Sequence, residues 1–147
     1  MVARVRNPRK EIWRLVPSLP GLLASSRGRL MLAPYRAQLV RGGERQYGGD
    51  PTRGQWDGKR FIHIVNRRTY KVARLVCEAF HGAPPFSGAV CMHLDENSRN
   101  NEPSNLAWGT QKQNLNAPGF LAYCRGRTGE NSPTTKARAA RMNARQP

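Results

Sequence analysis

The fold is decided by one stretch, VCMHLDENSRNNEPSNLAWGT, at positions 90–110. Residues 89–93 are apolar and end in a histidine, which predicts a short strand, and residues 106–108 predict a second one after a polar, Asn-rich loop. Thr110 and Gln113 have the spacing of a capping box, in which each side chain satisfies a backbone N–H group near the other residue. We therefore expect the order strand, loop, strand, helix.

This order is expected to bring His93, Asn105 and Asn114 close together, at the end of the first strand, the end of the loop and the first turns of the helix. A neutral histidine can take a proton from water near pH 7. An amide oxygen can ligate a hard cation such as Mg²⁺, and the cation can stabilise the phosphoryl charge and the leaving oxygen. These are the parts that hydrolysis of a phosphodiester bond requires.

The stretch resembles the HNH endonucleases of phages and mobile introns, in the branch whose motif runs H-x-D-x-N-x-x-N-N-x-x-x-N-L-x-W-x-T-x-x-x-N. The positions that match this motif are His93, Asp95, Asn97, Asn100, Asn101, Asn105, Leu106, Trp108, Thr110 and Asn114. The resemblance implies an α+β fold with a small ββα-metal core. It also implies His93 as the general base, Asn105 as the residue that braces the loop orienting His93, and Asn114 as a metal ligand.

The motif departs from the family pattern at Met92. In well-studied members this position holds an Asp or His that also ligates the metal, and methionine is a poor ligand for Mg²⁺. Either Asp95 or a reoriented His93 would then complete the site, and we take Asp95 as the second candidate ligand. The implied cofactor is one divalent metal ion, Mg²⁺, for which Mn²⁺ is expected to substitute.

Other polar residues of the motif have simpler interpretations. Asn-rich loops commonly supply turn chemistry, so Asn97, Asn100 and Asn101 are interpreted as loop formers. Asp95 has the alternative role of holding a backbone N–H group. His63, in an apolar strand, and His81, at a helix end, are interpreted as structural.

The charge of the chain indicates a polyanionic partner. It has 25 Lys and Arg against 9 Asp and Glu, a net charge of +16. Residues 1–80 carry 17 basic and 5 acidic side chains, whereas residues 81–119 carry 2 and 3. We expect double-stranded DNA as the partner, bound in a salt-dependent way because each neutralised phosphate releases a counterion. The predicted DNA contacts are Arg27, Arg29, Arg67, Arg68, Arg74, Lys112, Arg125 and Arg127.

Upstream of the motif, short strands and turns are expected. Residues 25–28 read as a turn into a strand at residues 29–32, and Gly48 and Gly49 mark a turn in an exposed excursion over residues 40–58. Residues 61–65 predict a strand. Apolar residues at i, i+3, i+4, i+7 and i+8 predict an amphipathic helix over residues 70–80.

The chain is divided into four predicted parts. Residues 1–10 form a basic arm, and residues 11–60 resemble the NUMOD4-like, β-rich DNA-binding module that is often joined to these nucleases. Residues 61–118 form the HNH nuclease domain. Residues 119–147 are interpreted as a basic, flexible tail that orders only on DNA.

Cysteine usage and hydropathy predict a soluble protein of a bacterial host's cytoplasm. Cys77, Cys91 and Cys124 include no C-x-x-C pair, so neither a disulfide framework nor a zinc knuckle is indicated. The apolar stretch at residues 19–24 is interrupted by Pro20 and is too short for a membrane span. We expect a monomer or weak dimer with no membrane partner and no small-molecule cofactor.

The function predicted from the sequence is a metal-dependent HNH endonuclease that nicks or cuts DNA, encoded by a phage or mobile element as a homing enzyme. The alternative is a catalytically degenerate DNA-binding protein that keeps the HNH scaffold, and Met92 favours it. RNA or ribosome binding is a third hypothesis, which the lack of paired aromatic residues for base stacking disfavours.

Overall fold

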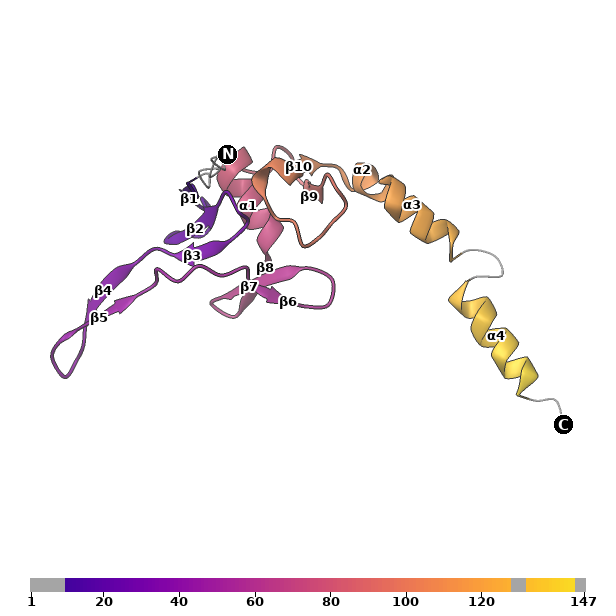
Figure 1. Cartoon of the computed structure of the whole chain (residues 1–147), viewed down its shortest axis with the longest axis horizontal. Coiled ribbons are helices and arrows are strands. Elements are labelled where there is room, and N and C mark those ends of the chain that lie inside the picture. The colour runs from indigo at the N-terminus through magenta and orange to yellow at the C-terminus, as the bar shows by residue number, and fades with distance from the viewer. Residues whose placement is uncertain (1–9, 128–131, 145–147) are drawn as a thin grey trace, which may run out of the picture. The chain divides into compact units, whose positions relative to one another are not determined.

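The structure is a computed structural model that describes residues 10–127 and 132–144. The chain forms two compact units, residues 1–109 and residues 110–147. The regular structure of the first unit is mainly small antiparallel sheets, and that of the described part of the second unit is helical (Figure 1). The α+β class predicted from the sequence is therefore confirmed.

The first unit begins with a three-stranded sheet of β1 (Trp13–Leu15), β2 (Leu22–Ser25) and β3 (Leu30–Leu32), paired in the order β1-β2-β3. The turn predicted at residues 25–28 joins β2 to β3. Its Gly28 has a φ of 72°, a left-handed conformation that glycine adopts without a steric cost. The β3 strand begins one residue later than the sequence predicted.

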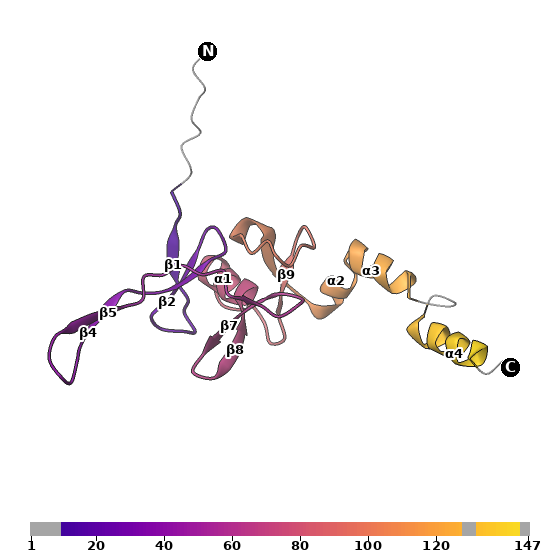
Figure 2. The ribbon, with the colours of Figure 1, turned by 60° about the horizontal axis from the view of Figure 1, so that its bottom comes forward.

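A two-stranded hairpin follows, formed by β4 (Tyr35–Gln38) and β5 (Glu44–Tyr47). At its base the rings of Tyr35 and Tyr47 are stacked, with their centroids 5.3 Å apart. Both views of the ribbon show that the hairpin extends away from α1 (Figures 1 and 2). The exposed excursion predicted for residues 40–58 therefore contains regular structure, the β5 strand and the short β6 strand (Gln55–Trp56).

The β6 strand starts a second three-stranded sheet with β7 (Phe61–Val65) and β8 (Arg68–Lys71). The β7 strand has the bounds predicted from the sequence. Asn66 and Arg67 join β7 to β8 with φ values of 48° and 63°. Two successive left-handed residues are typical of the tight turn that matches the twist of a hairpin.

The helix expected over residues 70–80 is α1 (Val72–His81). It ends where Gly82 adopts a φ of 85° and donates its N–H to Glu78 O at 3.1 Å, a helix end that glycine favours. The first three periodic apolar residues of α1, Val72, Leu75 and Val76, are buried, and the last two are half-buried. The amphipathic pattern therefore identified both the helix and its core-facing side.

The apolar face of α1 lies in one core, to which elements from the start and from the end of the first unit contribute. The sheet β1-β2-β3 covers one part of this face and β10 (Leu106–Gly109) covers another. The buried members of the core are Val16, Leu22, Ala24, Leu30, Val72, Ala73, Leu75, Val76, Cys77 and Leu106. Residues from both sides of the predicted boundary at position 60 thus contribute to the same core.

One buried carboxylate joins α1 to the N-terminal sheet. Glu78 is 8% exposed, and its carboxylate accepts hydrogen bonds from the backbone N–H of Ser18 at 2.7 Å and from the Ser18 hydroxyl at 2.8 Å. Ser18 lies in the connection between β1 and β2, so this pair fixes that connection against the helix.

The second unit contains α2 (Gln111–Leu115), α3 (Pro118–Arg125) and α4 (Pro133–Asn143). The capping box predicted for α2 is present: the Thr110 hydroxyl accepts from Gln113 N at 3.1 Å, and Gln113 Oε1 accepts from Thr110 N at 2.8 Å. The sequence pattern predicts a flexible tail after α2 and no further helix, because α3 and α4 lack a strong apolar period. Among the described residues, no helix is long and apolar enough to cross a membrane.

Substitution of Glu78 tests the link between α1 and the N-terminal sheet. We expect Glu78→Ala to lower the free energy of unfolding by about 2 kcal/mol, because two hydrogen bonds to a charged group are lost in a buried setting. Glu78→Gln should cost less than about 1 kcal/mol, since its amide can bond to the same two groups of Ser18. Urea denaturation measures both values, and equal losses in the two variants would contradict this role.

Candidate active site

The predicted site lies on a hairpin of β9 (Val90–His93) and β10, which pair antiparallel with His93 opposite Leu106. A further hydrogen bond, from Leu94 N to Asn105 O at 2.8 Å, continues the pairing beyond the last strand residues. Leu106 is 2% exposed and belongs to the core beneath α1. The backbone of His93 is therefore held by a strand that is anchored in the core.

The imidazole of His93 has one hydrogen-bond partner among the described residues, the side chain of Asn101. His93 Nε2 lies 2.8 Å from Asn101 Oδ1. An amide oxygen only accepts hydrogen bonds, so Nε2 must be the protonated nitrogen. In the neutral ring, Nδ1 then carries the lone pair, which is the state in which a histidine can take a proton from water.

Asn101 itself is fixed in place, because it is only 5% exposed. The sequence pattern predicts Asn101 only as a loop former, without a role at the site. Its position in the motif, directly after Asn100, was the available signal. Sequence spacing could not show which Asn of the loop faces the imidazole, since this depends on how the loop folds back over His93.

Asn105 and Asp95 form the centre of the loop. Asn105 Nδ2 donates to Asp95 Oδ1 at 2.8 Å and to Asn100 O at 2.9 Å, and Asn105 Oδ1 accepts from Asp95 N at 3.0 Å. All three bonds join residues that are five or ten positions apart. Asn105, 9% exposed, thereby ties the two ends of the loop together. Its predicted bracing role in catalysis is consistent with these contacts and stays a prediction.

The Asp95 carboxylate accepts three hydrogen bonds from the loop. Besides Asn105, its donors are Asn100 Nδ2 at 2.9 Å and the backbone N–H of Asn97 at 2.8 Å. The Asn100 amide, followed by the Asn97 N–H, lowers the pKa of Asp95 below its usual value. The alternative interpretation of Asp95 as an acceptor for a backbone N–H therefore describes contacts that are present. A fourth lone pair, on Oδ2, has no hydrogen-bond donor among the described residues.

The loop is also held from outside. Ser98 Oγ donates to Lys59 O, in the turn between β6 and β7, at 2.7 Å. The Arg99 guanidinium lies 3.9 Å from the ring centroid of Trp56 on β6. Near the end of the loop, His81 Nε2 donates to Pro103 O at 2.7 Å. These contacts give His81 the structural position expected for it.

Asn114 lies on α2, in the second unit, and its backbone N–H bonds to Thr110 O at 3.1 Å. The predicted convergence of Asn114 with His93 and Asn105 stays a prediction. Met92, half-buried on β9, pairs with Ala107. The described residues contain no group of three or more His, Cys, Asp and Glu side chains that could hold a metal ion.

The basic residues predicted to contact DNA lie on separate elements. Arg29 forms an ion pair with Glu11. Arg74 donates a hydrogen bond to Ala89 O at 3.0 Å, and its guanidinium lies over the Trp108 ring. Arg67 and Arg68 are exposed at the turn between β7 and β8. Arg27 lies in the turn before β3. The remaining three, Lys112, Arg125 and Arg127, lie in the second unit, and Arg127 contacts Tyr123.

Comparison with known proteins shows which family the segment around this site resembles. Residues 70–116, which contain α1, the loop and α2, match the family model described as HNH endonuclease. The resemblance predicted from the motif is thereby confirmed for this segment. The NUMOD4-like character of residues 11–60 stays a prediction.

Among solved structures, the chain is similar to the HNH homing endonuclease I-HmuI, in a structure that describes its DNA binding and cleavage. The two are 21% identical, the match covers 92% of this chain and 70% of that chain, and the TM-score is 0.47. No curated protein matches the chain.

Two asparagines of the loop provide a matched test of its architecture. We expect Asn105→Ala to lower the free energy of unfolding by about 2 kcal/mol, because it removes three partly buried hydrogen bonds and leaves their partners unpaired. Asn97→Ala should cost less than about 1 kcal/mol, since Asn97 is exposed and its side chain accepts one bond, from Arg99 N. Thermal or urea unfolding measures the difference, and a loss at Asn97 equal to that at Asn105 would contradict the central position of Asn105.

Proposed function

We propose that this chain is a metal-dependent DNA endonuclease that hydrolyses phosphodiester bonds, with His93 as its general base. The observation that carries the proposal is the hydrogen bond from His93 Nε2 to Asn101 Oδ1, which leaves the lone pair on Nδ1. The match of residues 70–116 to the HNH endonucleases supports the same reaction class.

In the proposed reaction, His93 Nδ1 takes a proton from a water molecule as the water oxygen attacks phosphorus. The ring then carries a positive charge, and its Nε2–H bond to the Asn101 oxygen becomes a charge-assisted hydrogen bond, which is stronger than the neutral one. Asn101 therefore stabilises the charged ring more than the neutral ring. The bond between phosphorus and the 3′-oxygen breaks, and the leaving oxygen takes a proton from solvent, which gives 5′-phosphate and 3′-hydroxyl ends as the family resemblance implies.

The candidate ligands offer oxygen atoms, the ligand type that a hard divalent cation prefers. Asp95 offers a carboxylate oxygen that accepts only one hydrogen bond in the loop, and Asn114 offers an amide oxygen. A bound Mg²⁺ would stabilise the phosphoryl charge and the leaving oxygen. The assignment of Asp95 and Asn114 to one ion rests on the sequence resemblance, and we propose Mn²⁺ as a substitute.

The net charge of +16 supports double-stranded DNA as the substrate. Of the predicted contact residues, Arg67 and Arg68 are exposed at a left-handed turn and form no ion pair with the described residues. We propose them as phosphate contacts that position the duplex. A homing enzyme of a phage or mobile element, acting as a monomer or weak dimer, is the biological form we propose.

The first test is a plasmid-nicking assay at low salt with Mg²⁺, Mn²⁺ or EDTA. We expect cleavage that EDTA abolishes and that His93→Ala lowers by 100-fold or more, since a positioned general base contributes about 10² to 10⁴ in rate. DNA affinity, measured in the same buffer by fluorescence anisotropy, should change less than twofold. Cleavage by His93→Ala at the rate of the unchanged chain would refute the role of His93.

Met92 favours a second candidate function, a DNA-binding protein whose HNH scaffold no longer cleaves. A thioether supplies no hard oxygen at the position where the family has a metal ligand. In this case the basic surface would bind DNA with the salt dependence of the first proposal, but no metal would activate cleavage.

Substitution of Met92 separates the two functions. We expect Met92→Asp to raise Mg²⁺ affinity about tenfold in isothermal titration, because it adds a carboxylate oxygen next to His93. Met92→Leu, which keeps the apolar volume, is the control and should leave the affinity unchanged. A chain that cleaves DNA only after Met92→Asp would establish the degenerate scaffold, whereas cleavage by the unchanged chain would exclude it.

A further inference from the structure

The turn between β2 and β3 lies directly against the residue that holds His93. A Cβ atom added at Gly28 would lie 2.7 Å from both the backbone C and the backbone O of Asn101, and 2.9 Å from its Cβ. Real Cβ atoms do not approach other heavy atoms so closely, so any side chain at this position has to displace the turn or Asn101. Gly28 and Asn101 are 73 positions apart, and Gly28 lies outside the segment that matches the HNH family, residues 70–116.

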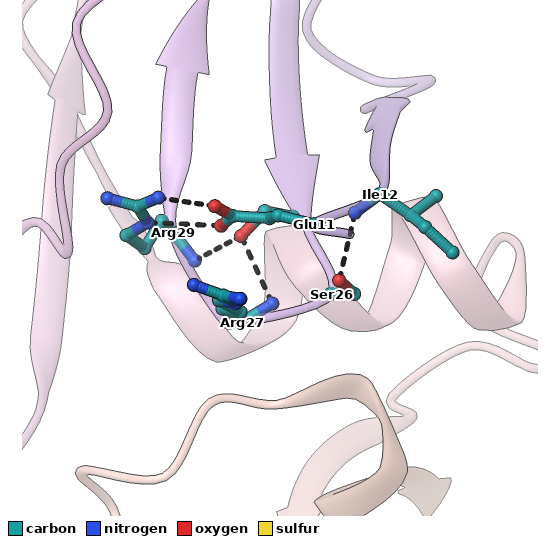
Figure 3. Close-up of polar contacts among 6 residues, drawn as sticks. Glu11, Ile12, Ser26, Arg27 and Arg29 are labelled. Atoms are coloured by element: carbon teal, nitrogen blue, oxygen red, sulfur yellow. Dashed lines mark hydrogen bonds and ion pairs between the residues drawn. The ribbon is translucent and has the colours of Figure 1, made fainter. Parts of the chain in front are cut away.

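Polar contacts restrain the turn, and Figure 3 shows those around Glu11, Arg27 and Arg29. The hydroxyl of the fully buried Ser25 accepts hydrogen bonds from the backbone N–H groups of Arg27 at 3.2 Å and Arg29 at 3.0 Å. Gly28 N donates to Ser25 O at 3.0 Å, which closes the turn. Glu11 forms an ion pair with the Arg29 side chain, and the Arg29 partner lowers the pKa of Glu11 below its usual value.

The loop on the other side of this contact is also restrained. Ser98 is bonded to Lys59 O, and Arg99 lies over Trp56, so the two residues before Asn100 are fixed to the sheet β6-β7-β8. Asn105 fixes Asn100 itself through the Asn100 carbonyl. A displacement imposed on Asn101 is therefore not relieved by a shift of the whole loop, and it changes the position of the Asn101 amide relative to the imidazole.

We propose that the turn of residues 25–29 is a positioning element of the active site, which holds the Asn101 amide against His93 Nε2 from a part of the chain outside the HNH match. This inference rests on the proposed function of His93 as a general base. The N-terminal sheet then has a role in the chemical step that is separate from DNA binding. A misplacement of about 1 Å at a catalytic group can lower a rate about 100-fold, so a small movement of the turn is enough to matter.

The test compares Gly28→Ala with Gly88→Ala. Gly88 has a φ of 81°, close to the 72° of Gly28, but a Cβ at Gly88 meets no atom within 4 Å. Both variants carry the same left-handed backbone cost, and only Gly28→Ala disturbs Asn101. The first readout is the exchange rate of the His93 side-chain N–H proton with water, measured by NMR on the full chain without DNA or metal.

We expect this N–H proton to be protected in the unchanged chain and in Gly88→Ala, and to exchange at least tenfold faster in Gly28→Ala, as in Asn101→Ala. In the nicking assay, Gly28→Ala should lower kcat tenfold or more with less than a twofold change in KM for DNA. The NMR measurement does not depend on cleavage. If the chain never cuts DNA, the proposed function is refuted, and the exchange rates still show whether the turn positions Asn101.

Glu11→Gln provides a milder variant in case Gly28→Ala does not fold, as judged by circular dichroism. It adds no atom to the contact and removes the charge that holds Arg29, so the turn should be less restrained. We expect N–H exchange that is several-fold faster than in the unchanged chain, with DNA binding as tight or tighter because a negative charge is lost. The proposal would be overturned if the His93 N–H proton exchanged within twofold of its rate in the unchanged chain, in each of the two variants, Gly28→Ala and Glu11→Gln, that folds.

Discussion

The apolar face of α1 has to be covered on two sides, and this requirement places the other elements of the first unit. Val72, Leu75 and Val76 are removed from water only if the N-terminal sheet covers one side of the helix and β10 covers another. Burial of such side chains contributes about 1.5 to 3 kcal/mol each, which is large compared with the net stability of a small domain. The two parts of the sequence that the helix joins therefore fold as one unit.

This shared core explains how a small chain can position polar groups accurately. The loop between β9 and β10 has little apolar content, so its shape depends on hydrogen bonds rather than on packing. Asp95, Asn100 and Asn105 satisfy one another, and among the described residues no buried side-chain nitrogen or oxygen lacks a partner. Such a network is rigid when complete, because each missing bond would leave a desolvated polar group. The core supplies the fixed ends that the network needs.

Much of the local structure could be predicted from the sequence. The apolar period located α1, the capping box located the start of α2, and the apolar run at residues 61–65 predicted the bounds of β7. These features depend on near neighbours in the chain, so their signals are contained in short windows. The helices α3 and α4 were missed for different reasons: α4 is mostly polar, and α3 is only eight residues long, too short to show a clear apolar period.

The sequence by itself determined the motif, its candidate base His93 and the charge that indicates a nucleic-acid partner. Only the tertiary structure decided that Asn101 is the residue that faces the imidazole, and that the turn at Gly28 lies against it. A motif records spacing along the chain, whereas the tautomer of a histidine depends on which acceptor lies within about 3 Å of each ring nitrogen. That distance is set by the packing of segments far apart in the chain, which no local pattern contains.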